Sequence, residues 1–344
     1  MANIVRVLVV DDSAYVRKVV SQMLERSPII EVVGTARDGS EALEQVEALS
    51  PDVVTCDLNM PVLDGVGFVR AQMARRPVPI VIISIAAQSG EQVLAALDAG
   101  AIDFIQKPTA LATEKLMDIG DELVAKVKGA ALAPRRGLQA AAVSTPRAIP
   151  RRVNGGAVDV VVIGISTGGP QALKVLIPQF PADCPVPIAM VLHMPIGYTE
   201  MYAQKLNDIC AVQVIEAKGG EEVVAGLAFL APAGRHLTFV GSAGRVFTHL
   251  DVKPLDTPHR PAVDVLFHSA ADVYGSRVLG VVMTGMGSDG REGAAWIKAR
   301  GGSILTESEE SCVVYGMPRS VVEAGLSDDT VPLERLAQSI MEKL

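Results

Sequence analysis

The sequence predicts an α/β protein built from two doubly wound parallel sheets. The chain has 344 residues, more than the roughly 100–200 residues of one domain. Short β-branched runs alternate with helical apolar patterns on both sides of residues 126–152. This middle segment is rich in Ala, Pro and Arg and has seven basic and no acidic side chains, which is typical of a linker. We therefore expect domains at 1–125 and 153–344.

Five strands are expected in the first half, with helical segments between them. Val16, Val19, Met23 and Leu24 recur at helical spacing and predict the apolar face of the first helix. Strands connected through helices form a parallel sheet, and five of them in about 125 residues favour a flavodoxin-like domain. The predicted strands are Arg6–Val10, Val32–Ala36, Val53–Asp57, Ile80–Ser84 and Asp103–Gln106.

The second half repeats the alternation and predicts a Rossmann-like sheet. One stretch, 226–249, is rich in strand-forming residues and has Ala-Gly turns, which indicates an inserted β-hairpin. The predicted sheet strands are Val158–Ile165, Ile188–Leu192, Val212–Ile215, Val278–Met283 and Ser303–Leu305.

Composition excludes several classes of protein. The net charge of −8 argues against nucleic-acid binding as the main role, because phosphate contacts need a basic surface. No apolar run approaches the roughly 20 residues of a membrane helix, and residues 1–6 lead into a strand without the pattern of a signal peptide. The four cysteines have no paired spacing, so we expect neither disulfides nor zinc, and a cytoplasmic location.

Charged and hydroxyl side chains follow the strands of the first half. Asp11 and Asp12 end the first strand, Asp57 the third and Ser84 the fourth, while Lys107 follows the fifth. The carboxyl ends of parallel strands share one edge, so these groups are expected to converge. Clustered carboxylates repel one another unless a cation lies among them, and Mg²⁺ prefers oxygen ligands. The pattern predicts a magnesium-assisted phosphoacceptor pocket, in preference to ordinary loop acids.

These residues resemble a two-component receiver domain over about 120 residues. The segment 60–65, Met-Pro-Val-Leu-Asp-Gly, matches the receiver loop after the acceptor. The resemblance implies that Asp57 accepts the phosphoryl group and that the Asn59 carbonyl joins Asp11, Asp12 and Asp57 at the metal. It also implies that Ser84, Phe104 and Lys107 act as switch residues. One departure is Ile85, since the residue after the switch serine is usually small.

The second half contains Gly164-Ile165-Ser166-Thr167-Gly168, a G-x-S-x-G pattern at an expected strand-to-helix turn. Such a turn presents a serine hydroxyl beside a helix N-terminus, where negative charge is favoured. The pattern alone leaves a phosphate-binding glycine-rich turn as an alternative.

Two other strand ends favour the hydrolase. His193 follows the strand that ends at Leu192, and Asp289 lies in the loop after the strand that ends at Met283. Nucleophile, base and orienting carboxylate would then share one sheet edge. The order Ser, His, Asp differs from that of α/β-hydrolases. Of the other histidines, His259 is a loop residue that could contact substrate, whereas His236, His249 and His268 are interpreted as structural.

The second half also resembles the catalytic domain of the chemotaxis receptor methylesterase family, protein-glutamate methylesterase/protein-glutamine glutaminase. A departure from that family is Ile165, where a small residue is usual. The matching segments are 163–170, 193–195, 231–236, 259–268, 283–293 and 313–318.

The resemblance implies a response regulator whose output domain is an esterase. Its substrate would be a glutamate methyl ester on a chemoreceptor, with receptor glutamines as a second substrate. The chemotaxis histidine kinase would be the phosphodonor, and phosphorylation would uncover the catalytic cleft. The backbone amides of Thr167 and Met286 are expected at the oxyanion, and Mg²⁺ belongs to the receiver alone. Two alternatives stay open: an esterase for another ester, and a phosphorylation-dependent binding module with reduced catalysis.

Overall fold

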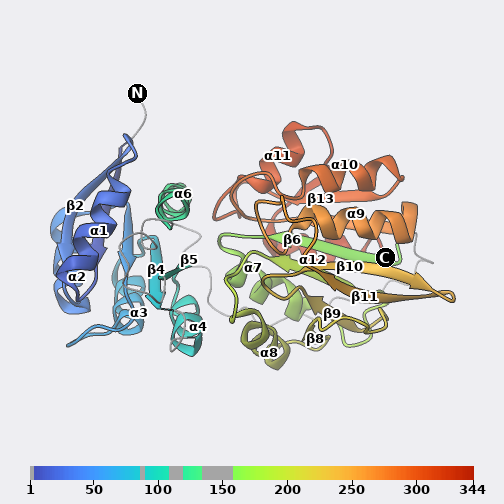
Figure 1. The fold of residues 1–344 in the computed structure, drawn as a ribbon, viewed down its shortest axis with the longest axis horizontal. Helices are drawn as coiled ribbons and strands as arrows, with labels where there is room; N and C mark the ends of the chain where they lie inside the picture. The colour runs from blue at the N-terminus through green and yellow to red at the C-terminus, as the bar shows by residue number, and fades with distance from the viewer. Residues whose placement is uncertain (1–3, 86–89, 108–118, 134–157) are drawn as a thin grey trace. The chain divides into compact units, whose positions relative to one another are not determined.

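The computed structural model describes residues 4–85, 90–107, 119–133 and 158–344 (Figure 1). The chain divides into two compact units, 1–142 and 143–344, and each is described by itself. Most of the predicted linker, from residue 134 on, lies outside the described residues. Within the described ranges, no helix combines the length and the apolar character that a membrane span requires.

The first unit contains the expected parallel sheet of five strands. Their order is β2-β1-β3-β4-β5, and every neighbouring pair is parallel. This is the flavodoxin-like order, in which the chain moves outward in both directions from β1. The strands are β1 (Val5–Val10), β2 (Ile30–Ala36), β3 (Val53–Cys56), β4 (Ile80–Ile85) and β5 (Asp103–Lys107).

In the part of the first unit that the structure describes, five helices accompany this sheet, with α1 beside α6 and α3 between α2 and α4. Three of them begin at a side-chain cap: Ser13, Asp38 and Asp64 each accept a hydrogen bond from a backbone amide of the first turn. Val19, Met23 and Leu24 are buried as predicted, whereas Val16 is half-buried. The helices are α1 (Ala14–Leu24), α2 (Gly39–Leu49), α3 (Gly65–Arg75), α4 (Gly90–Asp98) and α6 (Gly120–Ala131).

The helix α6 crosses the boundary that we placed at residue 125. It contacts β3, β4 and β5, and its Leu123 and Val127 are fully buried. Lys126 Nζ lies 2.8 Å from Asp103 Oδ1 on β5 and donates to the Phe104 carbonyl oxygen. Residues 126–131 are therefore part of the first unit, because an apolar helical face continues through them.

The second unit is organised around a seven-stranded parallel sheet with the order β14-β13-β12-β6-β7-β9-β8. The strand β6 is central: β7 pairs with it on one side and β12 on the other. The sheet thus extends from β6 in both directions. A crevice forms at the carboxyl ends of the strands where the strand order reverses in this way. The strands are β6 (Val160–Ile165), β7 (Ile188–Leu192), β8 (Gln213–Glu216), β9 (Leu227–Leu230), β12 (Val278–Val282), β13 (Ser303–Glu307) and β14 (Asp329–Val331).

The predicted hairpin is present but shorter than the stretch assigned to it. It consists of β10 (His236–Ser242) and β11 (Arg245–Asp251), which pair with each other and not with the main sheet. The tight turn at Ala243 and Gly244, both with positive φ, suits the twist of a two-residue hairpin. The first part of the stretch is β9, which lies between β7 and β8 in the main sheet.

Helices cover both faces of the second sheet (Figure 1). On one face α9 packs against α10, which contacts α11, and on the other α7 contacts α8 and α12. The core includes Val160, Val162 and Val191 from the sheet and Leu266 and Phe267 from α9. The helices are α7 (Gly169–Leu176), α8 (Thr199–Ile209), α9 (Val263–Tyr274), α10 (Arg291–Ala299), α11 (Met317–Glu323) and α12 (Leu333–Met341), with short 3-10 turns η2 (Ile177–Gln179) and η3 (Gly275–Arg277).

Candidate active site and phosphoacceptor site

The three predicted hydrolase residues follow three neighbouring strands. Ser166 comes directly after β6, His193 after β7, and Asp289 lies in the loop after β12. The register pairs Ile165 with Leu192, and the His193 amide donates to the Ile165 carbonyl oxygen at 3.1 Å. Ser166 and His193 are therefore the next residues along two paired strands, at the edge where the sheet changes direction.

The turn that carries Ser166 is tightly packed. Gly168 has a φ of 79°, and α7 begins directly after it with Pro170 in its first turn. The Ser166 amide donates to the Thr284 carbonyl oxygen at 3.0 Å. Gly285 lies so close that a Cβ there would come within 2.8 Å of the Ser166 Cβ. Ile165 is fully buried, so its side chain belongs to the core.

His193 and Asp289 form a close pair. His193 Nε2 lies 2.8 Å from Asp289 Oδ2, and only 9% and 10% of the two side chains are exposed. Burial alone would raise the pKa of Asp289, but the hydrogen bond and charge of His193 outweigh it and lower that pKa to about 2. The carboxylate thus stays ionised. The other ring nitrogen, Nδ1, is buried and has no hydrogen-bond partner among the residues described.

The carboxylate of Asp289 is held by the start of α9. Its Oδ2 accepts from the Val263 amide at 2.8 Å and its Oδ1 from the Asp264 amide at 2.9 Å. Asp264 in turn accepts from the amides of Gly290 and Gly293, at 2.9 and 2.7 Å. Burial raises the pKa of Asp264 to about 7, and the nearby Asp289 charge adds to the effect. Asp264 has no recognisable signal in the sequence, because its partners are backbone amides more than 20 residues away.

The other histidines differ in their relation to this pair. The His259 ring stacks on that of His193, with centroids 4.0 Å apart and planes 25° from parallel. His236 is fully buried: its Nδ1 accepts from the Ala262 amide, and its Nε2 faces the Pro254 carbonyl oxygen. The His268 ring stacks on Trp296, and His249 is exposed on β11. The geometry thus brings only His259 against the predicted base.

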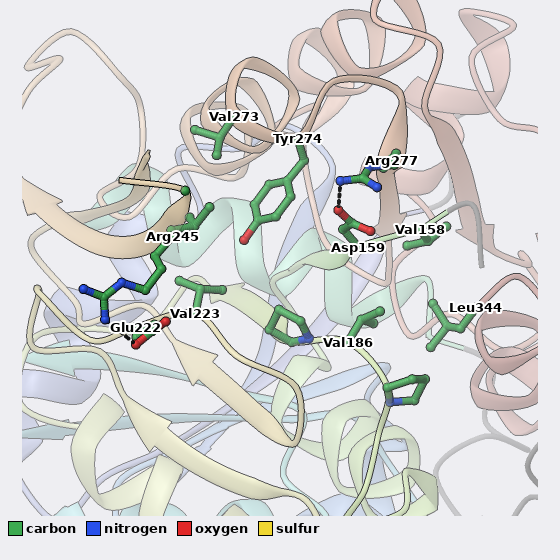
Figure 2. A pocket seen from close by; sticks show the side chains of 14 residues that line it. Val158, Asp159, Val186, Glu222, Val223, Arg245, Val273, Tyr274, Arg277 and Leu344 are labelled. Atoms are coloured by element: carbon green, nitrogen blue, oxygen red, sulfur yellow. Dashed lines mark hydrogen bonds and ion pairs between the residues drawn. The ribbon is translucent and has the colours of Figure 1, made fainter. Parts of the chain in front are cut away.

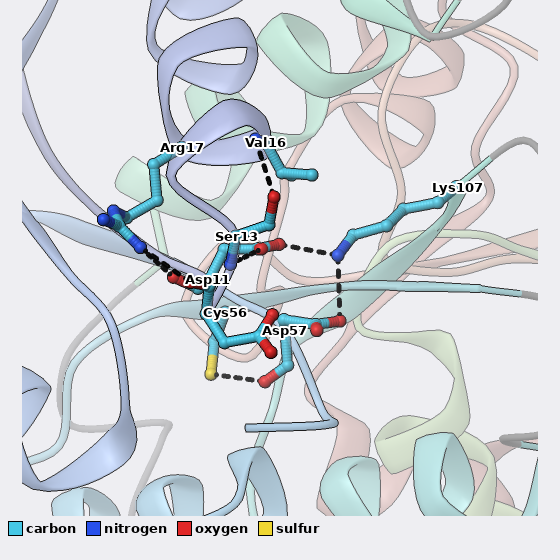
Figure 3. Close-up of polar contacts among 8 residues, drawn as sticks. Asp11, Ser13, Val16, Arg17, Cys56, Asp57 and Lys107 are labelled. Atoms are coloured by element: carbon cyan, nitrogen blue, oxygen red, sulfur yellow. Dashed lines mark hydrogen bonds and ion pairs between the residues drawn. The ribbon is translucent and has the colours of Figure 1, made fainter. Parts of the chain in front are cut away.

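The predicted acceptor pocket is assembled at the carboxyl edge of the first sheet (Figure 3). Oxygen atoms of Asp11, Asp12 and Asp57 lie within 4.8 Å of one another. Lys107 Nζ lies 2.6 Å from Asp11 Oδ2 and 3.0 Å from Asp57 Oδ1. Asp11 and Asp57 are buried, whereas Asp12 is exposed. The cluster consists of oxygen donors with one side open to solvent, which fits a hydrated divalent cation such as Mg²⁺.

The charges of Asp57 and Lys107 each shift the pKa of the other residue. Burial raises the pKa of Asp57, although the Lys107 charge opposes this shift. Burial would lower the pKa of Lys107, but the charges of Asp57 and Asp11 outweigh it and raise that pKa. A cation in the carboxylate cluster would relieve the repulsion between Asp11 and Asp57.

The other residues predicted to act with this pocket lie on β4 and β5 or in the segment after β3. Ser84 near the end of β4 and Phe104 on β5 are buried, and Asn59 is exposed two residues after Asp57. Cys56, next to Asp57, is fully buried. Ile85 ends β4, but its side chain lies outside what the structure describes, as do residues 86–89 that follow. The metal, phosphorylation and switch roles of these residues stay predictions.

A pocket of about 540 Å³ lies at the opposite edge of the second sheet (Figure 2). Asp159 precedes β6 and Arg277 precedes β12, so the lining gathers at the amino ends of the strands. Its charged residues are paired, Arg277 with Asp159 and Arg245 with Glu222. The pocket is therefore separate from the edge that carries Ser166, His193 and Asp289.

Comparison with protein families matches both units. The model of the CheB methylesterase family covers residues 161–340, and that of the response regulator receiver domain covers residues 7–119. The chain belongs to the CheB methylesterase family. The CheB methylesterase match includes Ser166, His193 and Asp289, and the receiver match includes the carboxylate cluster. The chain is thus a response regulator with a methylesterase-type output domain.

Relatives of this CheB methylesterase family match along nearly the whole chain. Protein-glutamate methylesterase/protein-glutamine glutaminase 5 of Myxococcus xanthus is 51% identical and covers 96% of this chain and 95% of its own. The protein-glutamate methylesterase/protein-glutamine glutaminase of Halalkalibacterium halodurans is 42% identical over 100% of this chain and 99% of its own. The crystal structure of the Thermotoga maritima CheB methylesterase catalytic domain aligns with a TM-score of 0.53 at 41% identity, covering 54% of this chain and 99% of its own.

Proposed function

We propose that the chain removes methyl groups from glutamate methyl esters of chemoreceptors and deamidates receptor glutamines, under control of its receiver. Membership of the CheB methylesterase family and the names of its relatives support this activity. The observation that carries it is the His193–Asp289 pair at 2.8 Å, next to Ser166 across two paired strands. At this edge Ser166, His193 and Asp289 would serve as nucleophile, base and orienting acid, which is the constellation of serine acyl transfer.

In the proposed reaction His193 acts through Nδ1. This nitrogen takes the proton from Ser166 Oγ as the hydroxyl attacks the ester carbonyl, and Asp289 stabilises the resulting imidazolium through Nε2. The imidazolium then gives this proton to the departing methoxide oxygen, which leaves as methanol, or to the departing amide nitrogen, which leaves as ammonia when the substrate is glutamine. Water, activated by the same imidazole, releases the glutamate from the acyl-enzyme. In chymotrypsin-like triads Nδ1 faces the carboxylate, so the two nitrogens exchange roles here.

The oxyanion of the tetrahedral intermediate needs preorganised donors. We assign this role to the backbone amides of Thr167 and Met286. Thr167 is the first residue after the nucleophile, and Met286 follows Gly285, which packs on the Ser166 Cβ. The N-terminus of α7 adds a favourable field for the negative charge.

The substrate assignment is tested by comparing two esters. We expect the full chain to release methanol from a receptor cytoplasmic fragment methylated on glutamate, and to hydrolyse a small alkyl ester much more slowly. A faster reaction with the small ester would favour the alternative of an esterase for another substrate. Failure of both reactions, together with no labelling of Ser166 by a fluorophosphonate, would favour a binding module.

For control of the enzyme we propose that Asp57 accepts a phosphoryl group from the chemotaxis histidine kinase. Asp11, Asp12 and Asp57, with the Asn59 carbonyl, would hold Mg²⁺, which supplies charge neutralisation for the incoming phosphoryl group. Ser84 and Lys107 would then bind its oxygens, with Phe104 following the switch. The same proposal places the protein in the cytoplasm, where the kinase and the receptor tails are found.

Replacing Asp57 by asparagine is expected to preserve the basal rate of methanol release and to abolish its stimulation by a phosphodonor. The reason is that Asp57 lies in the first unit, so its change alters the population of the active state and not the acyl transfer itself. The measurement is the initial rate with and without acetyl phosphate and Mg²⁺, and EDTA serves as the matched control on wild type. Stimulation that persists in Asp57→Asn would place the phosphorylation elsewhere.

The isolated fragment 153–344 is expected to be more active than the unphosphorylated full chain, if the receiver and linker restrict access to the catalytic edge. The second compact unit is 143–344, which supports testing the catalytic fragment separately from the receiver. Both proteins are compared on the same methylated receptor fragment, with thermal melting to check the fold. Equal or lower activity in the fragment would contradict inhibition and require the receiver to activate directly.

A further inference from the structure

Thr284, the second residue after β12, is fully enclosed and joins three segments around the nucleophile. It is 1% exposed, and its carbonyl oxygen accepts from the Ser166 amide at 3.0 Å. Its Oγ1 lies 3.0 Å from the Thr167 carbonyl oxygen and accepts from the Val314 amide at 3.0 Å. One residue thus binds both Ser166 and Thr167, together with the segment that precedes α11.

The amide of Thr284 is fixed by a buried acid at the end of β13. It donates to Glu307 Oε2 at 2.9 Å, and Ser311 Oγ donates to Glu307 Oε1 at 3.0 Å. Glu307 is fully buried. Burial raises the pKa of Glu307 to about 7. Placing an ionisable carboxyl group at this position therefore costs folding free energy. An apolar residue at position 307 would leave the Thr284 amide without its acceptor.

We propose that Thr284 is a positioning residue for Ser166, and that Glu307 holds Thr284 in that role. The next residue, Gly285, packs on the Ser166 Cβ and leads to Met286. Thr284 would therefore fix the position of the turn that carries Ser166 and also that of the Met286 amide, a proposed oxyanion donor. Neither Thr284 nor Glu307 touches the reacting atoms. They act by limiting the displacement of Ser166, and a displacement of about 1 Å can cost about 100-fold in rate.

The inference rests on the proposed function and is tested with two matched pairs of variants in the full chain. Thr284→Val keeps the shape but removes the hydroxyl, and Thr284→Ser keeps the hydroxyl. We expect Thr284→Val to lower kcat for methanol release by about 10- to 100-fold with little change in KM, and Thr284→Ser to stay within about threefold of wild type. The rate of Ser166 labelling by a fluorophosphonate should fall in parallel with kcat.

The second pair separates positioning from folding. Glu307→Gln retains an acceptor for the Thr284 amide and Glu307→Met does not, so only the methionine variant should slow Ser166 labelling. If Thr284→Val fails to show a cooperative melting transition, this pair decides the question. Equal labelling rates within each folded pair would overturn the inference. Normal labelling of wild-type Ser166 without methanol release from the receptor would instead refute the proposed substrate and leave the positioning role standing.

Discussion

Replacing Ser166 by alanine is expected to lower kcat for methanol release by roughly 10⁴–10⁶ while the fold survives. The loss is this large because Ser166 supplies the protein atom that forms a covalent bond to the substrate in the proposed reaction. The side chain is half-buried at the end of β6, and the bonds that hold the turn are made by its backbone. Removing one hydroxyl therefore leaves two backbone hydrogen bonds in place, from the Ser166 amide to the Thr284 carbonyl oxygen and from the Gly169 amide to the Ser166 carbonyl oxygen.

The measurement is methanol release from the methylated receptor fragment, with thermal melting of each protein. Ser288→Ala is a matched control, because Ser288 is an exposed serine in the loop that carries Asp289. We expect this control to stay within about twofold of wild type, as is usual for surface substitutions. Activity of Ser166→Ala within tenfold of wild type would show that another group is the nucleophile.

The strand ends were the most predictable part of this protein. Asp11, Asp57, Ser166 and His193 each follow a short β-branched run, and the run itself fixes where the polar residue must emerge. The structure accordingly places Asp11 beside Asp57 and His193 beside Asp289. The roles of these residues stay proposals, but their convergence follows from parallel strands sharing one edge.

Features without a local signal were missed. The strand β9 is parallel to β8, yet residues 217–226 between them contain no helix, so the stretch was interpreted as part of the hairpin. The strand β14 has only three residues, two of them exposed, and shows no periodicity. Asp264 and Glu307 each accept a hydrogen bond from a backbone amide more than 20 residues away in the sequence. Only the tertiary arrangement reveals such partners.

The orientation of the His193 ring also required the structure. A strand end predicts that the imidazole reaches the sheet edge, but not which nitrogen faces the carboxylate. Here the β7 backbone and the α9 amides that hold Asp289 direct Nε2 to the carboxylate. Nδ1 remains buried beside the Ser166 strand, without a partner among the described residues. The proposed exchange of roles between the two ring nitrogens would thus follow from where α9 begins.

His193→Gln and Asp289→Asn are each expected to lower kcat by several orders of magnitude, and the double variant is expected to be little worse than the worse single variant. In the proposed reaction the pair acts as one unit with Ser166. Once one of the two residues is lost, the other would have no proton transfer to support. Burial strengthens this dependence: an Asp289 carboxylate with a pKa of about 2 stabilises an imidazolium that His193→Gln cannot form.

The test compares log kcat for the two single variants and the double variant on the methylated receptor, with His249→Gln as the control histidine. His249 is exposed on β11, so its replacement should leave kcat within about twofold. Additive losses would mean that one residue of the pair works outside the triad. His259, whose ring centroid lies 4.0 Å from that of His193, would then be the next base to test. In that case His259→Gln should abolish the activity that remains in His193→Gln.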